Sequence, residues 1–533
     1  MQTLTIPESD VLTQAEADLI RPYVTNLDRP VFGLRNLPEE VIAVLFAYYS
    51  RSRDPLRKNL VKLLSETWDT ASASAALSRE GLTYAEETAR RFHERWVVGY
   101  GHASVAEHAV AHLAVEGLSM IGTKLIEDCR LASYTEKSTR YVVFDRDSFY
   151  PEPTLAGSAY AYLYTSTCQR LLDTYTVLMP KVIAAIETTT PKSANQTPAA
   201  HATACKAKAC DILRYLLPAS VRTNLGMTVG ARELARMISK LLSSPLAEGQ
   251  LLGTQIKVEG QLLIPTLLKH AEANPYLAET EAALLESGQA FDRLPAGEPF
   301  VRMIPCADPG TGEARYQPED PDTAVRLVET PADAENRLIT ALLYGASEQG
   351  YPEIRNKVRE LSADERTHVI EEAFRRRGPY DQPPRALEHL NYTFDVLIDY
   401  GAYRDLQRHR LCSQTTQLLS TRYGWSTPEA IGDLKLTSVY EQAMQQAASA
   451  HVAIARDYPH EAQYVLPLAY RKRTLFTLNL RELHQIIQLR SGKQGHPSYR
   501  KIAQEMFRAV ERVHPTIAQY ISVDLNDYAL ARG

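Results

Sequence analysis

The chain has 533 residues, of which 44% are hydrophobic and 23% are charged. This is the composition of a globular protein, and it excludes disordered and collagen-like chains. At about 150 residues per domain the length predicts several domains, or two large ones. The formal net charge of -5 argues against a general nucleic-acid coat.

No run of residues approaches the roughly 20 apolar residues of a membrane-spanning helix. The N-terminal sequence MQTLTIPESD also lacks the basic and then apolar pattern of a signal peptide. The six cysteines form no CxxC pair, so neither a disulfide framework nor a zinc ribbon is predicted. We therefore expect a cytoplasmic chain with reduced thiols, no metal site, no membrane partner and no polymeric nucleic acid as partner.

The first predicted elements are a strand-like segment with Val31 and Leu34 and a helix that starts at Pro38. The same arrangement recurs later, where a strand-like run from Val325 precedes a proline and an apolar-periodic helix. A recurrence of this kind indicates an internal duplication.

The duplication continues in three longer blocks. Glu107-His108 and Ser138-Thr139-Arg140-Tyr141 recur as Glu388-His389 and Ser420-Thr421-Arg422-Tyr423, at offsets of 281 and 282 residues. The segment around Pro218 recurs around Pro467 at an offset of 249, so the second copy lacks roughly thirty residues in its middle. We predict two homologous domains, 28–285 and 322–528, and a linker at 286–321 that is rich in Pro, Gly, Asp and Glu.

Helical patterns dominate both halves, with scattered strand-like runs between them, which predicts a helix-rich α+β protein. No GxGxxG opens a strand-turn-helix unit and no GxxxxGK[ST] occurs. Rossmann and P-loop chemistry are therefore not predicted.

The sharpest local feature is Arg408-His409-Arg410, with Arg404 one helical turn earlier. Guanidinium groups bind phosphate through two parallel hydrogen bonds and stay charged, so this cluster could hold a phosphorylated ligand. A solvated basic helix end is an equally ordinary explanation, since cations also suit helix C-termini.

A second candidate block contains His102, Ser104 and Glu107, which could bind ribose hydroxyls. As a zinc site it is incomplete, and Ser104 with Glu107 also fits a capping box at a helix start. Four arginines lie near predicted helices, and each taken singly is more typical of a surface or salt-bridge residue than of a ligand-binding one: Arg214, Arg232, Arg481 and Arg490.

Taken together, these blocks resemble the flavin-dependent thymidylate synthase family (ThyX), present twice in tandem. The family signature is Gly-His-x-Ser/Thr-x-x-Glu-His, then Arg-His-Arg with a spaced Ser and Arg-Tyr, then Arg-x-x-Leu-Pro, Asn-x-Arg and Leu-Arg. The resemblance covers most of both halves. It implies two tandem domains, each a mainly antiparallel sheet with packed helices.

The two copies depart from the signature at different positions. The first copy keeps Gly101-His102-x-Ser104-x-x-Glu107-His108, the Ser138 to Tyr141 block and Arg214-x-x-Leu217-Pro218, but has Asp128-Cys129-Arg130 for Arg-His-Arg, Gly230 for the Asn, and Leu241 for the last Arg. The second copy keeps Arg408-His409-Arg410, Asn479-x-Arg481 and Leu489-Arg490. It lacks the Gly-His block around Gly378 to Pro384, has Gln463 in place of the arginine of Arg-x-x-Leu-Pro, and has two extra residues before Ser420. Because the losses are nearly complementary, we expect one composite site to which both halves contribute.

The resemblance implies a role for each matched residue. Ser138, Arg140 and Arg214 would hold the phosphate of dUMP, with Glu136 and Arg490 at the pyrimidine. FAD would be held by His102, Ser104, Glu107, Arg408, His409, Arg410, Asn479 and Arg481. Asp128 would repel an anionic ligand from the reciprocal site, most strongly where water is excluded.

The implied reaction is the conversion of dUMP to dTMP, with NADPH and methylene-tetrahydrofolate as co-substrates of the FAD enzyme. It needs electrostatic preorganisation and proximity of flat ligands rather than a protein nucleophile. Because the family's sites lie at subunit interfaces of a tetramer, the resemblance also implies a dimer that forms a pseudo-tetramer. Two alternatives remain open: flavin-dependent modification of another pyrimidine nucleotide, and a non-catalytic protein that binds flavin or nucleotide.

Overall fold

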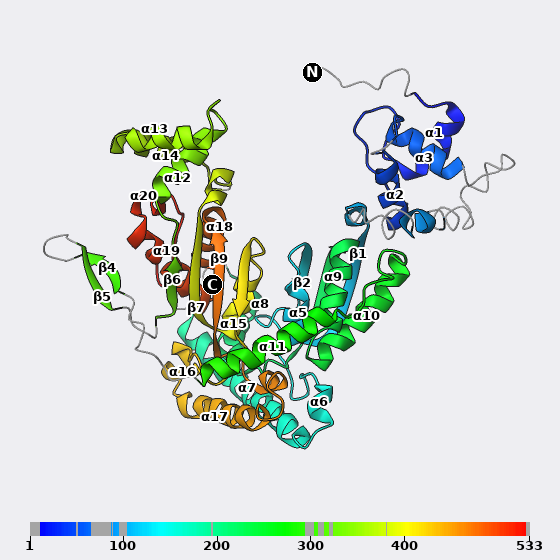
Figure 1. Ribbon diagram of the computed structural model, residues 1–533. Coiled ribbons are helices and arrows are strands. Elements are labelled where there is room, and N and C mark those ends of the chain that lie inside the picture. The colour runs from blue at the N-terminus through cyan, green and yellow to red at the C-terminus, as the bar shows by residue number, and fades with distance from the viewer. Residues whose placement is uncertain are drawn as a thin grey trace. The chain divides into compact units, whose positions relative to one another are not determined.

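The computed structural model describes residues 11–49, 52–65, 87, 89–94, 104–192, 196–293, 303–307, 314–318, 323–379 and 381–528 (Figure 1). The chain forms two compact units. The first unit comprises Met1–Leu118, Leu125–Glu136 and Asn224–Gln289, and the second comprises Ser119–Lys124, Lys137–Thr223 and Ala290–Gly533. The packing units therefore do not coincide with the two halves of the sequence. The predicted boundaries of the repeats, at 28–285 and 322–528, stay a prediction.

The first unit combines a small helical cluster with a three-stranded sheet in the order β1-β3-β2. The elements that lie wholly or mainly in it are α1 (Gln14–Ile20), η2 (Arg21–Tyr23), α2 (Glu39–Tyr49), α3 (Leu56–Ser65), η5 (Val105–His108), β1 (Val110–Ser119), β2 (Ala132–Glu136), β3 (Arg222–Gly230), α9 (Ala231–Leu242), α10 (Ala247–Leu263) and α11 (Pro275–Asp292). The predicted helix after Pro38 is confirmed as α2, whereas the strand expected at Val31 and Leu34 is reduced to one isolated bridge between Val24 and Leu34.

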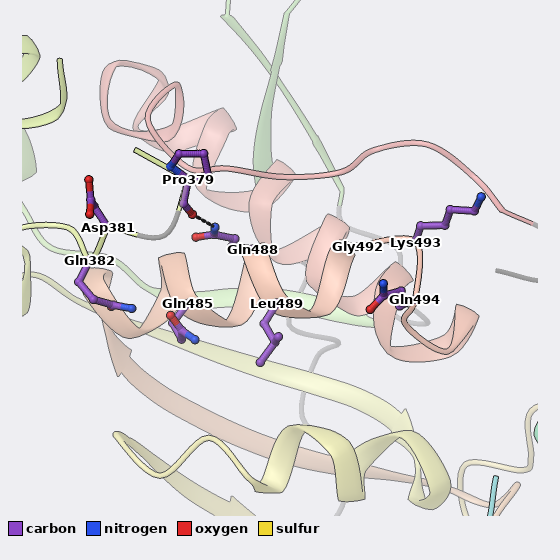
Figure 2. A pocket seen from close by; sticks show the side chains of 9 residues that line it. All are labelled: Pro379, Asp381, Gln382, Gln485, Gln488, Leu489, Gly492, Lys493 and Gln494. Atoms are coloured by element: carbon purple, nitrogen blue, oxygen red, sulfur yellow. Dashed lines mark hydrogen bonds between the residues drawn. The ribbon is translucent and has the colours of Figure 1, made fainter. Parts of the chain in front are cut away.

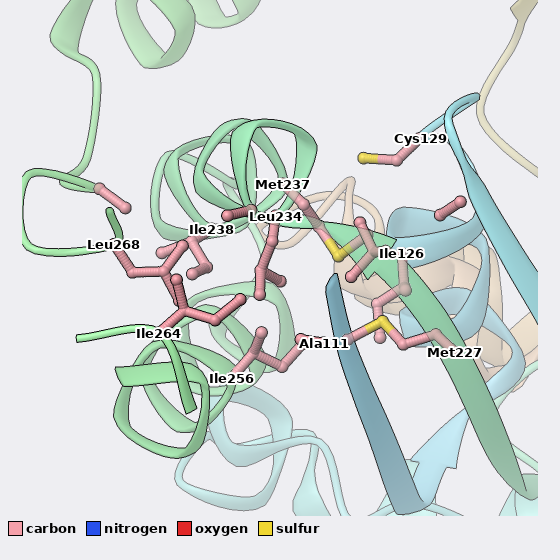
Figure 3. Close-up of a cluster of buried hydrophobic side chains, with 14 of the residues drawn as sticks. Ala111, Ile126, Cys129, Met227, Leu234, Met237, Ile238, Ile256, Ile264 and Leu268 are labelled. Carbon is pink, nitrogen blue, oxygen red and sulfur yellow. The ribbon is translucent and has the colours of Figure 1, made fainter. Parts of the chain in front are cut away.

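Helix α9 shows why this unit folds as it does. Its buried residues Leu234, Met237, Ile238 and Leu241 recur at the 3.6-residue period and form one apolar stripe. Figure 3 shows three of them packed with Ile256 and Ile264, and with Met227 of β3. The helices are thereby fixed on one face of the sheet.

The second unit is built on a four-stranded antiparallel sheet in the order β6-β7-β9-β8. Its strands are β6 (Val325–Glu329), β7 (Asn391–Asp399), β8 (Cys412–Thr416) and β9 (Arg471–Asn479), beside a separate hairpin of β4 (Met303–Ala307) and β5 (Ala314–Pro318). Its helices from the later half are α12 (Ala334–Tyr344), α13 (Tyr351–Glu360), α14 (Ala363–Phe374), η7 (Arg385–His389), α15 (Tyr400–Gln407), α16 (Glu429–Asp433), α17 (Thr437–Ile454), η8 (Glu461–Val465), α18 (Leu480–Ser491), α19 (Pro497–Val513) and α20 (Pro515–Ala518). Helices α5 (Met120–Glu127), α6 (Pro153–Ala156), α7 (Ala161–Thr189), α8 (Pro198–Leu213) and η6 (Arg214–Leu216) also lie wholly or mainly in this unit.

The same order of elements occurs in both halves of the chain. The succession β1, α5, β2, β3, α9, α10 corresponds to β7, α15, β8, β9, α18, α19, and the strand orders β1-β3-β2 and β7-β9-β8 match. The predicted helix-rich α+β class with antiparallel sheets is confirmed. Among the described helices, none is long and apolar enough to cross a membrane.

Within the second unit, two equivalent Leu-Pro segments of the repeat pair with each other. Pro218 forms a β-bridge with Pro467. The backbone N–H of Ala219 donates to the carbonyl of Leu466 (2.8 Å), and that of Leu468 donates to the carbonyl of Leu217 (2.9 Å). Because each bond is the counterpart of the other at the 249-residue offset, the contact has the self-complementary form of a two-fold dimer interface.

The buried His484 on α18 yields a test of how this unit responds to pH. Its ring is 1% exposed, stacks on Phe374, and has no hydrogen-bond partner for either nitrogen in the described part of the chain. Burial lowers the pKa of His484 to about 3, so the unfolded chain takes up this proton near pH 6.5 while the folded protein does not. Stability from this residue is therefore present above pH 6.5 and is lost as the pH falls below it.

We predict that His484→Phe removes this loss. Relative to the wild type, the variant should gain about 2 kcal/mol of unfolding free energy between pH 7 and pH 5, measured by urea denaturation. The matched control is His389→Gln, at an exposed position, which should leave the pH dependence as it is. Parallel stability curves for the wild type and His484→Phe would contradict the prediction.

Candidate functional site

The Arg408-His409-Arg410 cluster lies where α15 ends. Strand β7 ends at Asp399, whose carboxylate accepts a hydrogen bond from the N–H of Ala402 (2.7 Å) and caps the helix. His409 is buried, whereas Arg408 and Arg410 are exposed. The cluster thus presents two guanidinium groups to solvent around an imidazole that points into the protein.

His409 connects α15 to α18. Its Nδ1 is 3.0 Å from Glu482 Oε1, and Arg490 Nε donates to its Nε2 at 2.9 Å. Because arginine only donates, Nε2 accepts, and the proton of the neutral ring sits on Nδ1 and is donated to Glu482. Burial lowers the pKa of His409 against the effect of Glu482, and the charge of Arg490 lowers it further, which agrees with a neutral ring. His409 therefore fixes the orientation of the Arg490 guanidinium.

Arg140 of the first repeat is buried in the second unit against Asp211. Its Nε and Nη2 donate to the two carboxylate oxygens, the second at 2.6 Å, in a fork-to-fork pair. Burial alone would lower the pKa of Arg140, but Asp211, with smaller effects of Tyr499 and Asp405, raises it overall. The guanidinium is permanently charged and held in one plane.

Arg214 is the unusual group of the second unit. It is 3% exposed, and its Nη1 lies 3.7 Å from Asp405 Oδ2, which is too long for a hydrogen bond. Its Nε and Nη2 have no hydrogen-bond partner among the described residues. An unsatisfied buried donor costs about 1 to 3 kcal/mol, more when charged, so a ligand with anionic oxygens would stabilise this side chain.

Asp405 interacts electrostatically with the basic groups of this site. Its charge raises the pKa of Arg140, His409 and Arg490, and it also faces Arg214. Arg490 lies over the Tyr499 ring at 5.5 Å from its centre, and Tyr499 raises the pKa of Arg490. The second unit thus brings Arg140 and Arg214 of the first repeat together with His409 and Arg490 of the second.

The other predicted site residues have separate environments. Ser138, also in the second unit, accepts a hydrogen bond from the N–H of Arg140 (3.2 Å), whereas Glu136 ends strand β2 in the first unit. Asn479 caps α18 by accepting from the N–H of Glu482 (2.9 Å). His102 lies outside the described residues.

The predicted capping box at Ser104 is wrong. Ser104 precedes the 3-10 turn η5 and makes no capping hydrogen bond, because Glu107 pairs instead with Arg232. The second repeat contains the counterpart of this pair: Arg481 bonds Glu388 at 3.0 Å and also donates to the carbonyl of Pro383. Both arginines are thus engaged with protein groups.

The reciprocal positions of the repeat have different environments. Asp128 pairs with Lys240 at 2.9 Å, so its charge is compensated, and burial raises the pKa of Cys129, at the His409 position, to about 12. Gln463, at the Arg214 position, bonds the backbone of Leu419 and His460. Arg422, at the Arg140 position, is exposed and 3.5 Å from Asp292.

An open groove of about 520 Å³ runs along α18 (Figure 2). Its wall carries the side chains of Gln485, Gln488 and Leu489, and Gln488 Nε2 donates to the carbonyl of Pro379 at 3.2 Å. The loop that contributes Pro379 lies where the second repeat lacks the Gly-His block. Side-chain amides both donate and accept, so this wall can bind the edge of a heteroaromatic ring.

Sequence reasoning missed Asp211, Glu482 and Tyr499. Glu482 had a usable signal, because Arg481-Glu482-Leu483 repeats Arg232-Glu233-Leu234 at the 249-residue offset. Asp211 had none, since a carboxylate inside a long helix is ordinary until the residue that packs against it is known.

We predict that Arg140→Ala destabilises the protein by about 3 to 5 kcal/mol, because it leaves the buried Asp211 carboxylate unpaired. Arg422→Ala, the same change at the exposed counterpart, should stay within about 0.5 kcal/mol of the wild type. Urea unfolding followed by circular dichroism measures both values. Equal effects of the two changes would show that Arg140 and Asp211 are not a buried pair.

Comparison with known proteins agrees with the duplicated architecture. The family model described as thymidylate synthase complementing protein (Thy1) matches residues 53–258 and again 326–516. A UPF0159 protein of Chlamydia muridarum is 34% identical over 98% of this chain and 97% of its own, and one of Thermoplasma acidophilum is 30% identical over 83% and 90%. A flavin-dependent thymidylate synthase of Geobacter sulfurreducens is 37% identical over 25% of this chain and 61% of its own. The chain belongs to the thymidylate synthase complementing protein (Thy1, ThyX) family.

Proposed function

We propose that the chain is a flavin-dependent thymidylate synthase-like methyltransferase that converts dUMP to dTMP with methylene-tetrahydrofolate and NADPH. The observation that carries the proposal is Arg214, a buried cation with two unpartnered nitrogens in the same unit as Arg140 and Arg490. A phosphate monoester offers three anionic oxygens, which satisfy such donors. Family membership supplies the reaction class.

In this proposal, Arg214 and Ser138 bind the phosphate directly, and Arg140 contributes charge from its fixed position on Asp211. Arg490 donates to the pyrimidine from an orientation held by His409. The work of these residues is to orient a planar ligand and to stabilise charge that develops on it.

The donor set fits FAD in part. Arg408 and Arg410 are exposed guanidinium groups, which suit a pyrophosphate. His409, Asn479 and Arg481 bond protein groups and would act by positioning. Ser104 and Glu107 complete the proposed flavin set, with His102. When bound, the reduced flavin would supply the hydride that completes the methyl group.

We further propose that two fused family domains give one competent site per chain. The support is the asymmetry of the repeat: Arg214, His409 and Arg490 have Gln463, Cys129 and Leu241 as counterparts, and the counterpart of the buried Arg140 is the exposed Arg422. A dimer of such chains would correspond to a tetramer of single-domain relatives. Two departures from the family signature support a second candidate, another pyrimidine nucleotide: the two extra residues before Ser420, and Asp405 where the family has Gln.

The test replaces Arg214 with the residue of its own counterpart. Arg214→Gln should weaken dUMP binding about 10- to 100-fold in calorimetry, because it removes charge-assisted hydrogen bonds. Arg422→Ala should leave dUMP binding unchanged. Undiminished dUMP affinity in Arg214→Gln would overturn the proposed site.

A second measurement separates the two candidate reactions. Wild-type protein loaded with FAD, given NADPH and methylene-tetrahydrofolate, should release tritium from dUMP labelled at C5. Nucleotide and flavin binding without tritium release would favour the other pyrimidine nucleotide or a non-catalytic protein. A protein that bound neither flavin nor dUMP would contradict all three candidates: the thymidylate synthase, the enzyme for another pyrimidine nucleotide and the non-catalytic binding protein.

A further inference from the structure

A second cavity in the second unit, of about 540 Å³, has a cationic wall outside the site described above. It lies where α19 packs against β6 and the end of β7 (Figure 1). Its volume falls in the range of small-molecule sites, about 300 to 1,000 Å³. Its charged lining residues are Arg471, Lys501, Arg508, Arg512, Asp399 and Glu505.

The cations of α19 form one stripe. Lys501, Arg508 and Arg512 are spaced seven and four residues apart, which places them on one face of the helix. All three are exposed, and none has a hydrogen bond or ion pair with another described residue. Asp399 and Glu505 add two carboxylates to the lining. Burial raises the pKa of both, and the charges of Lys501, Arg508 and Arg512 act in the opposite direction on Glu505.

The repeat supplies an internal comparison for this stripe. Helices α10 and α19 are each 17 residues long and align at an offset of 250 residues, with buried Leu252 and Ile256 matching buried Ile502 and Met506. At this alignment the counterparts of Lys501, Arg508 and Arg512 are Leu251, Val258 and Leu262, which are exposed and apolar. The cations are therefore a property of the second repeat, not a requirement of the helix in this fold.

We propose that this cavity is a second anion site that binds an oligophosphate, either free or as part of a nucleoside triphosphate. Three flexible cations without fixed partners match a chain of linked phosphates better than a single carboxylate. Arg471 adds a fourth donor from strand β9, held at its Nε by the carbonyl of Tyr423 (2.8 Å). A concave site of this volume favours a small ligand over a polymer.

The floor of the cavity connects it to Arg214. Asp399 accepts hydrogen bonds from Ser498 and from Tyr215 (3.1 Å), and Arg214 acts on its pKa. A ligand in the cavity would therefore lie beside the Asp399 carboxylate, and the charge of Arg214 acts on the same carboxylate. Provided that the proposed dUMP site is correct, occupancy of the cavity should change dUMP affinity through this group.

The test is calorimetric titration of the full chain with tripolyphosphate and with a nucleoside triphosphate. Both should bind to the wild type, and tighter binding of the nucleotide would identify it as the source of the oligophosphate. Arg508→Val with Arg512→Leu introduces the residues of α10 and should weaken both at least 10-fold. The control Arg375→Val with Arg376→Leu removes the same charge from exposed positions just after α14 and should have no effect.

Arg214→Gln separates this inference from the proposed function, because it should keep tripolyphosphate binding while losing dUMP. Absence of binding to the wild type, or equal binding to the α19 double variant, would overturn the oligophosphate site. Tighter binding of an RNA oligomer that depends on the same two arginines would also overturn it, in favour of a polymer surface.

Discussion

The pairing of Leu217-Pro218 with Leu466-Pro467 is the contact on which the candidate site depends. Two equivalent segments donate to each other's carbonyls, and the residues just before them carry Arg214 on one side and Gln463 on the other. The pairing fixes η6 and the end of α8 against the sheet of the second unit. Together with the hydrogen bond from Tyr215 to Asp399, it keeps Arg214 buried near Asp405.

Charge compensation is the second constraint, and it explains which arginines are available to a ligand. Arg140, Arg232 and Arg481 each face a carboxylate at hydrogen-bond distance. Arg214 faces Asp405 only at 3.7 Å and keeps two nitrogens without partners. Arg140, Arg232 and Arg481 thus form ion pairs with the protein, whereas Arg214 keeps the donors that the proposed phosphate would satisfy.

The sequence was sufficient to predict the repeat, the α+β class and the family, because blocks that recur in the same order survive loss of individual residues and a change of offset from 281 to 249. It also singled out Arg140, Arg214, His409 and Arg490, whose roles stay predictions. The sequence did not predict the pairing partners, because Asp211 is 71 residues from Arg140 and Glu482 is 73 residues from His409. The capping box at Ser104 failed for a related reason, since a distant arginine, Arg232, competes for the Glu107 carboxylate.

The Leu-Pro contact has a further consequence because both of its strands belong to one polypeptide. In a dimer of separate subunits, such an interface dissociates on dilution, and its occupancy follows the protein concentration. A tether replaces that dependence with a constant effective concentration, so the contact persists however dilute the protein becomes. The tether also allows Arg214 and Gln463 to differ, since a subunit encoded once and used twice would carry any replacement on both sides.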